Sequence, residues 1–103
     1  MNFLELIFGK KVNLQEIISN GALILDVRTK VEYQSGHLKN SINIPIDNLP
    51  QNINKLNKNK AIITCCASGA RSASATRILK SNGFEQVYNG GSWSSLKKYV
   101  VNK

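Results

Sequence analysis

Short apolar runs are spaced along the chain, and polar or amphipathic stretches separate them. Two runs, ALIL at residues 22–25 and AIITC at residues 61–65, show no regular alternation of apolar and polar positions. Such runs are typical of strands that are buried on both faces, as in a parallel sheet. SINIP at residues 41–45 and QVYN at residues 86–89 predict two further strands.

The stretches between these strands carry helix signals. Asn13 is suited to cap a helix over residues 14–20, with Glu16 as its capping-box partner and Gly21 as its left-handed end. Gly90 and Gly91 are expected to turn the chain into a final helix. Strands that alternate with helices predict an α/β fold, with a parallel sheet and helices on both of its faces. The further helices are predicted over residues 30–35, 46–56, 71–82 and 92–101.

The beginning of the chain differs from the rest. Residues 3–8 are densely apolar and predict a helix, but isolated helices shorter than ~12–15 residues are marginal in water. We therefore interpret residues 1–11 as a segment that packs on the domain formed by residues 12–103. A partner protein or a membrane surface is the alternative contact for this segment.

Length and composition limit the class of protein. A chain of 103 residues corresponds to one domain, and 42% hydrophobic residues are enough for one core. The two cysteines are neighbours, so they are poorly placed to bond each other and do not make a disulfide framework. No stretch approaches the ~20 apolar residues of a membrane span, and the lysines follow the first apolar run, unlike those of a signal peptide. We therefore expect free thiols and a cytoplasmic location.

The net charge of +8 is unevenly distributed. Residues 1–50 carry five basic and five acidic side chains, whereas residues 51–103 carry nine basic and one acidic. A positive field in this half would attract small anions, although a solvated lysine surface is the simpler interpretation. Binding of nucleic acid is disfavoured, because the basic residues are scattered and aromatic residues are not interleaved with them.

Candidate chemistry lies in CASGAR, residues 66–71, between a predicted strand and a predicted helix. Ligands bind beyond the carboxyl ends of parallel strands, and the first turn of a helix has unpaired N–H groups that stabilise an anion. A cysteine there can have its pKa lowered from ~8.5 to roughly 3.5–7.5. Arg71 would add positive charge and planar donors. The other loop residues are small and would leave an open cradle of amides; they are Ala67, Ser68, Gly69 and Ala70.

A thiolate beneath such a cradle suits two reactions. It can take up a sulfane sulfur as a persulfide, or it can attack a phosphate or arsenate ester. The alternative for Cys66 is a buried small apolar residue without chemistry. Cys65 should point to the opposite side of the extended strand and pack in the core. The alternative is that Cys65 is a resolving or redox-sensing thiol.

The chain resembles the single-domain rhodaneses, a family of sulfurtransferases, over residues 12–98. The similarity lies in three motifs in the order found in the family: LILDVRTKVEYQSGHLKNSINIP, CASGARS and GFEQVYNGGSW. The resemblance implies a five-stranded parallel sheet flanked by helices. It also implies a persulfide on Cys66, held by the backbone amides of Ala67, Ser68, Gly69, Ala70 and Arg71.

The length of the loop distinguishes the branches of this superfamily. Its sulfurtransferases have six residues from the cysteine to the arginine, whereas the related cell-cycle phosphatases and arsenate reductases have seven. Residues 66–71 are six, which favours sulfur transfer. Ala67 departs from the larger or charged residue that is common after the nucleophile, so the resemblance does not select thiosulfate as the donor.

Other residues match the first motif, and we interpret them as supporting the loop. Asp26 and Arg28 lie at a predicted strand end, where an ion pair would fix neighbouring segments. His37 is suited to a hydrogen-bonding role around the loop, with proton donation as the alternative. Trp93 is interpreted as core or as the wall of the site. The remaining matches are Glu32 and Asn43.

The sequence thus predicts an enzyme that moves a sulfane sulfur, from a donor such as thiosulfate, to cyanide or a thiol. No metal or organic cofactor is expected. The expected partners are a small anionic sulfur donor, the acceptor, and a sulfur-relay protein. The alternative is a persulfide carrier module that serves a partner protein and has little turnover of its own. A phosphatase or arsenate reductase is the third hypothesis.

Overall fold

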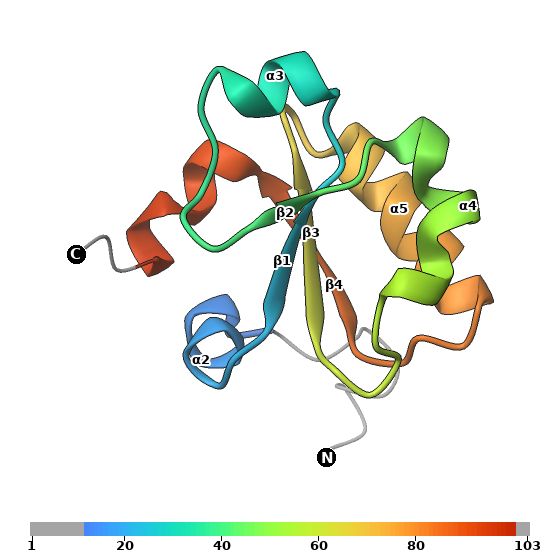
Figure 1. Ribbon diagram of the computed structural model, residues 1–103. Helices are drawn as coiled ribbons and strands as arrows, with labels where there is room; N and C mark the ends of the chain where they lie inside the picture. Colours follow the sequence, from blue (N-terminus) through green and yellow to red (C-terminus); the bar gives the residue numbers. More distant parts are fainter. Residues whose placement is uncertain (1–11, 101–103) are drawn as a thin grey trace.

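A computed structural model describes residues 12–100 and has a parallel sheet at its centre (Figure 1). Its strands are β1 (Leu23–Asp26), β2 (Ile42–Asn43), β3 (Ile62–Cys66) and β4 (Val87–Ser92). They lie in the order β2-β1-β3-β4, and every neighbouring pair is parallel. The described residues therefore form a four-stranded sheet, and the five strands implied by the resemblance are corrected to four. The described segments between the strands form helices and turns, so they offer no further strand to either edge.

Helices cover both faces of the sheet, as predicted. On one face, Leu25 and Ile62 of the sheet pack in a cluster with Leu49 and Leu79. On the other face, Ile24 and Ile63 pack with Leu96, and the helix at residues 14–19 lies against this second cluster. The alternation of side chains along each strand produces this division. The α-helices are α2 (Leu14–Ser19), α3 (Lys30–Gln34), α4 (Leu49–Asn52) and α5 (Ala70–Ser81), and the 3₁₀-helices are η1 (Ile46–Asn48), η2 (Ile53–Lys55) and η3 (Trp93–Tyr99).

Helix α2 begins where the sequence predicts. The Asn13 side chain accepts a hydrogen bond from the Glu16 N–H at 3.1 Å, and Gly21 follows the helix with a φ of +94°. A reciprocal capping box is found instead at α3. There the Thr29 hydroxyl accepts from the Glu32 N–H, while the Glu32 carboxylate accepts from the Thr29 N–H. This second cap orients the Glu32 side chain.

In two segments, the type and extent of the observed helices differ from the prediction. Residues 46–56 form η1, α4 and η2 in succession, because Pro50 has no N–H to continue an α-helix from Ile46. The last helix is 3₁₀ and covers Trp93–Tyr99. In its first turn the Ser95 hydroxyl donates to the Ser92 carbonyl at 2.7 Å, and such side-chain bonds compete with regular helix.

Predictions for both ends of the chain lie outside the described residues. These are the helix over residues 3–8, the packing of residues 1–11 and residue 101 of the final helix. Within residues 12–100, the longest α-helix is α5 with 12 residues, and none is long and apolar enough to cross a membrane.

Gly90 and Gly91 lie within β4 and do not form the expected turn. A Cβ atom at Gly90 would come within 2.7 Å of the Ile63 side chain and 2.8 Å of the Thr64 carbonyl oxygen. Gly91 has a φ of +77°, and the pairing of β3 with β4 shifts register between Thr64 and Cys66. The two glycines thus let β4 lie tightly against the end of β3 that carries Cys66.

We expect Gly90→Ala to lower the free energy of unfolding by about 1–3 kcal/mol, because the added methyl group meets backbone that cannot move aside. Urea denaturation measures this loss. Glu85→Ala, an exposed change just before β4, is the control and should stay within about 0.5 kcal/mol of the unmodified chain. A Gly90→Ala chain as stable as the control would contradict the close packing of β4 on β3.

Candidate active site

Cys66 is the last residue of β3, and the tight loop 67–69 leads from it into α5. Gly69 caps the helix with a φ of +104°, a left-handed conformation that favours glycine. A Cβ atom at Gly69 would lie 3.4 Å from the Gly91 Cα atom, so the loop also approaches β4 closely. The loop therefore folds back over the end of the sheet, as its position before a helix predicts.

The Cys66 sulfur is surrounded by hydrogen-bond donors. The Gly69 N–H donates to Sγ at 3.0 Å and the Ser72 N–H at 3.4 Å, and the Ser72 hydroxyl oxygen lies 3.6 Å away. Burial alone would raise the pKa of this thiol. The hydrogen bonds from Ser72, Gly69 and Ser68 outweigh it, and the pKa of Cys66 is lowered. The local geometry thus stabilises a thiolate.

Only part of the predicted cradle faces the sulfur in this conformation. The Gly69 and Ser68 amides hold down the pKa of Cys66, whereas Ala67, Ala70 and Arg71 make no hydrogen bond to Sγ within the described chain. Cys66 itself is 0% exposed, so the loop closes over the sulfur. A donor molecule can therefore reach the sulfur only if the loop moves.

Ser72 and Asn89 also belong to the site, although the sequence motifs did not predict a role for either. Ser72 is the third residue of α5, where the N–H has no partner inside the helix, so its position alone could have indicated a bond to the sulfur. The Ser72 hydroxyl in turn donates to Asn89 Oδ1 at 2.6 Å. Asn89 lies on β4, next to β3, and its place in the sheet was the available signal.

Arg71 is engaged by Glu32. The Arg71 Nη1 atom lies 2.7 Å from Glu32 Oε1, and Nη2 donates to Oε2 at 3.0 Å. Arg71 first, and then the Thr29 N–H, lowers the pKa of Glu32 to about 2, so the pair is ionised at neutral pH. Both terminal nitrogens of Arg71 bind Glu32, which is also the main cause that raises the pKa of Arg71.

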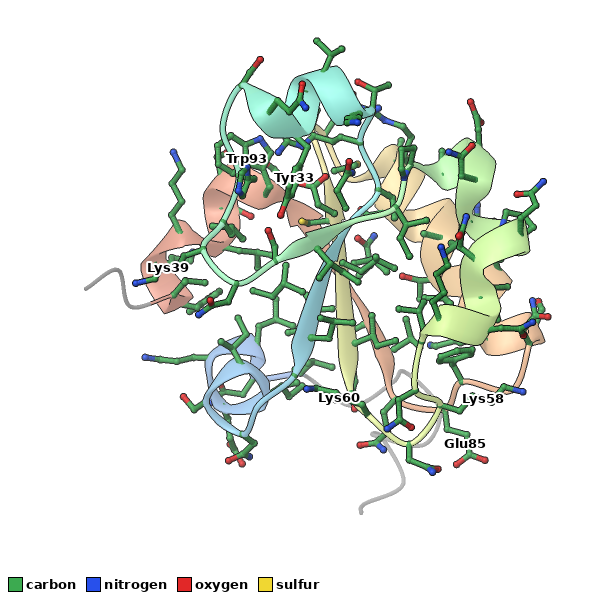
Figure 2. The ribbon with its side chains drawn as sticks, in the orientation of Figure 1. Tyr33, Lys39, Lys58, Lys60, Glu85 and Trp93 are labelled. Atoms are coloured by element: carbon green, nitrogen blue, oxygen red, sulfur yellow. The ribbon has the colours of Figure 1, made fainter. Side chains whose placement is uncertain are left out.

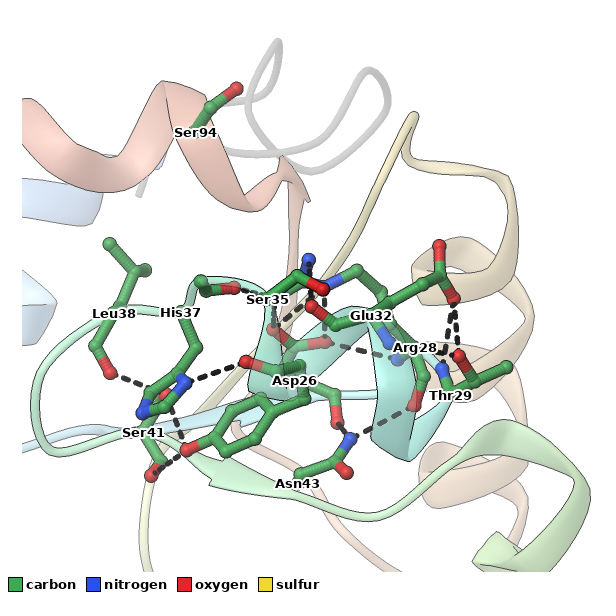
Figure 3. Close-up of polar contacts among 12 residues, drawn as sticks. Asp26, Arg28, Thr29, Glu32, Ser35, His37, Leu38, Ser41, Asn43 and Ser94 are labelled. Atoms are coloured by element: carbon green, nitrogen blue, oxygen red, sulfur yellow. Dashed lines mark hydrogen bonds and ion pairs between the residues drawn. The ribbon is translucent and has the colours of Figure 1, made fainter.

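The predicted pair of Asp26 and Arg28 is buried at the end of β1 (Figure 3). Arg28 Nη2 lies 2.7 Å from Asp26 Oδ2, and Nε donates to the same carboxylate at 3.0 Å. The guanidinium also donates to the carbonyls of Glu32 at 3.3 Å and Gly36 at 2.7 Å. Asn43 donates to the carbonyls of Asp26 and Arg28 at 3.0 and 2.9 Å. These bonds fix the middle of α3, and the segment that follows it, to the end of β1.

Trp93 and His37 complete the set of residues named from the sequence. The Trp93 ring lies 4.5 Å from the Arg28 guanidinium carbon and packs on the core cluster that contains Cys65. His37 is exposed; its Nδ1–H donates to the Tyr33 carbonyl at 2.7 Å, and its ring stacks on Tyr33. Within the described chain it makes no hydrogen bond to the loop 66–72.

Cys65 and Cys66 point to opposite faces of the sheet, as predicted. Cys65 is 0% exposed and belongs to the cluster with Ile24 and Ile63, whereas Cys66 belongs to the cluster on the other face. Burial first, and the nearby Asp26 carboxylate second, raise the pKa of Cys65 to about 12. Cys65 therefore remains a protonated thiol at neutral pH, while Cys66 is prepared to ionise.

The groups around Sγ suit an anion and not a cation, because they are N–H and O–H donors. Residues 12–100 contain no group of three or more His, Cys, Asp or Glu side chains that could hold a metal ion. Figure 2 shows Lys58 and Lys60 at the end of the sheet away from Trp93. Part of the positive charge of the second half of the chain thus lies far from the site.

Comparison with protein families and curated proteins yields consistent matches. The model of the rhodanese-like domain matches residues 11–98. "Putative sulfur carrier protein YrkF" of Bacillus subtilis is 38% identical over 80% of this chain, and the match covers 42% of that protein. A tRNA sulfurtransferase of Thermoplasma acidophilum is 30% identical over 89% of this chain and 18% of its own length. The chain therefore spans less than half the length of these two relatives.

Solved structures show the same similarity. A rhodanese-like domain protein of Staphylococcus aureus has a TM-score of 0.70 and 31% identity, with 81% of this chain and 86% of the other covered. A rhodanese-related protein of Thermoplasma volcanium has a TM-score of 0.71 and 32% identity, with coverages of 86% and 92%. A structure described as rhodanese with anions, from E. coli, has a TM-score of 0.68 and 30% identity over 72% of this chain and 89% of its own.

We expect Ser72→Ala to raise the pKa of Cys66 by about one unit, because the thiolate loses one of its hydrogen-bond donors. The ultraviolet absorbance of the thiolate, followed against pH, measures this pKa, with Cys66→Ser as the blank. Ser68→Ala removes an exposed hydroxyl from the same loop and should leave the pKa unchanged. Equal pKa values in the Ser72→Ala and Ser68→Ala chains would show that the Ser72 hydroxyl does not act on the sulfur.

Proposed function

We propose that this chain, which belongs to the family of rhodanese-like domains, transfers a sulfane sulfur through a persulfide on Cys66. The observation that carries the proposal is the placement of Cys66. Its sulfur lies at the carboxyl end of a central strand and accepts hydrogen bonds from the Gly69 and Ser72 amides. The free state of both cysteines supports a reducing compartment such as the cytoplasm.

The reaction has two steps. The Cys66 thiolate attacks the sulfane sulfur of a donor such as thiosulfate; a new S–S bond forms, and sulfite leaves with the electron pair of the broken S–S bond. An acceptor, cyanide or a thiolate, then attacks the outer sulfur of the persulfide. The electron pair of the Cys66–sulfur bond returns to Sγ, which regenerates the thiolate. Each step carries one unit of negative charge past the loop amides, which can stabilise it without a proton transfer.

The length of the loop supports sulfur over phosphate. Residues 66–71 span six positions from the cysteine to the arginine, as in the sulfurtransferases that the chain resembles. The engagement of Arg71 by Glu32 does not separate the two reactions, because thiosulfate presents several charged oxygens as a phosphoryl group does. Phosphatase or arsenate reductase activity is therefore the weaker hypothesis.

We expect Cys66→Ser to lower the rate of thiosulfate:cyanide sulfur transfer by roughly a thousandfold or more, because a hydroxyl cannot form the persulfide. Steady-state release of thiocyanate measures the rate. Cys65→Ser, which changes the neighbouring thiol on the opposite face, is the matched control and should keep most of the activity. Full turnover in the Cys66→Ser chain would remove the basis of the mechanism, and selective loss in Cys65→Ser would move the nucleophile to Cys65.

A sulfur carrier that serves a partner protein is the second candidate function. It is favoured by the closed loop, because a sulfur with no exposed area is protected from small acceptors. The name of the Bacillus subtilis relative, a sulfur carrier, supports the same hypothesis. In this case the natural partner would open the loop and receive the sulfur by direct transfer to its own thiol.

Intact-mass measurement after donor treatment separates the two functions. We expect one added sulfur atom per chain, located on Cys66, and its loss on addition of cyanide at a rate that matches steady-state turnover. A carrier would instead retain the sulfur for much longer than one turnover of the enzyme reaction. A chain that gains no sulfur from thiosulfate or from a small persulfide donor would contradict both functions.

A further inference from the structure

The Ser72 hydroxyl has a single proton and several acceptors around it. Asn89 Oδ1 lies at 2.6 Å, the Gly69 carbonyl oxygen at 3.0 Å, and Cys66 Sγ at 3.6 Å. Hydroxyl hydrogen bonds are typically about 2.7–2.8 Å long, so the contact with Asn89 is the strongest by geometry. When Cys66 is a thiolate, all these neighbours accept and none donates. The sulfur therefore competes with two oxygens for one proton.

The orientation of the Asn89 amide is fixed by its own partners. Oδ1 accepts a hydrogen bond from the Gly91 N–H at 2.9 Å, and Nδ2 donates to the Gly69 carbonyl at 3.5 Å. A flipped amide would place its NH₂ group against the Gly91 N–H, donor against donor. Oxygen and not nitrogen must therefore face Ser72, and the short contact requires the Ser72 hydroxyl to donate to Asn89.

These bonds form a chain that fits the thiol better than the thiolate. In the thiol state, the Cys66 S–H can donate to the Ser72 oxygen, while the Ser72 hydroxyl donates to Asn89. In the thiolate state, the same hydroxyl must turn toward Sγ to stabilise the charge. The Ser72 and Asn89 oxygens would then face each other at 2.6 Å without a proton between them. That repulsion works against the donation to sulfur.

We propose that Asn89 is a positioning residue for Cys66: its Oδ1 atom draws the Ser72 hydroxyl proton away from the sulfur and so limits how far this hydroxyl stabilises the thiolate. The inference rests on the thiolate role of Cys66 in the proposed function. It has a consequence for the reaction, because the nucleophilicity of a thiolate falls as the pKa of the thiol falls. Asn89 thus keeps the sulfur reactive while the backbone amides hold the charge.

Formation of the persulfide relieves this competition. The negative charge then lies on the outer sulfur, and Sγ becomes neutral. The Ser72 hydroxyl can remain bonded to Asn89, while the loop amides are left to the charged atom. The pair of Ser72 and Asn89 thereby favours the loaded state over the free thiolate.

The charged and titratable groups around Sγ come from the neighbouring elements. Arg71 lies at the start of α5 and is paired with Glu32 of α3, and Cys65 precedes Cys66 on β3. Asn89, from β4, is neutral and exposed. Replacing it leaves these charges in place, so a change in the titration of Cys66 can be assigned to the hydrogen-bond chain.

The test is the pKa of Cys66 in the unmodified chain and in four variants, measured from the absorbance of the thiolate. We expect Asn89→Ala to lower this pKa by about one unit, because water can replace Oδ1 without holding the Ser72 proton. Asn89→Asp retains the acceptor and adds a charge, so it should raise the pKa. Ser72→Ala should raise it as well, and adding Asn89→Ala to Ser72→Ala should cause no further change.

Two results would overturn the inference. The first is a Cys66 pKa that is unchanged or raised in Asn89→Ala. The second is a shift by Asn89→Ala that persists in the Ser72→Ala background, since the effect would then not pass through the Ser72 hydroxyl. If Asn89→Ala unfolds, as judged by circular dichroism, Asn89→Asp is measured with and without Ser72→Ala in its place. An equal shift of the Cys66 pKa in both backgrounds would refute the hydrogen-bond chain. None of these measurements requires sulfur transfer. A chain without sulfurtransferase activity would therefore still test the role of Asn89, and the two failures would be told apart.

Discussion

The buried ion pair of Asp26 and Arg28 organises the end of the molecule that carries the site. Removing one partner of such a pair costs about 3–5 kcal/mol, because the other charge is left without compensation. Arg28 uses its remaining donors on the carbonyls of Glu32 and Gly36, and so it holds the middle of α3 and the segment that follows the helix. Trp93 covers the guanidinium on one side. A charge buried at the end of β1 thus determines where α3 can lie.

Glu32 connects α3 to the loop that follows Cys66. The capping box with Thr29 orients the Glu32 carboxylate, and the carboxylate holds Arg71 at the start of α5. On its other side, the loop is held by Asn89 and by the close approach of Gly69 to Gly91. The loop is therefore supported from α3 and from β4 at once. The sulfur of Cys66 lies between the contacts from α3 and those from β4, and neither set places an uncompensated charge beside it.

Local signals were sufficient for much of the fold, and tertiary contacts explain most of what they missed. The buried runs at residues 22–25 and 61–65 became β1 and β3, and Asn13 caps α2, because each depends on neighbours in sequence. The glycines at 90 and 91 were misread as a turn, since their role is set by the atoms of β3 that they approach. The number of strands came from the resemblance and not from the apolar pattern, which itself indicated four.

The candidate site likewise combines features that local sequence predicts with features that only tertiary contacts determine. Cys66 and the direction of Cys65 follow from strand alternation and from the helix that begins after the loop. The engagement of Arg71 by Glu32 joins residues that are 39 positions apart, and the contact of Ser72 with Asn89 joins residues 17 apart. Neither spacing has a periodic signature. Only the order of the strands, with β4 beside β3, brings Asn89 to the loop.

The electrostatics of the site are those of dipoles and not of a cation. The chain has a net charge of +8, yet the positive charge that residues 12–100 place at the loop, that of Arg71, is compensated by Glu32. The sulfur is held by N–H groups within 3.4 Å, whose effect falls off over a short distance. Sulfur transfer moves a single negative charge over the length of one S–S bond, between Sγ and the outer sulfur. Dipoles of such short range can stabilise the charge at both positions, because the two sulfur atoms are bonded neighbours.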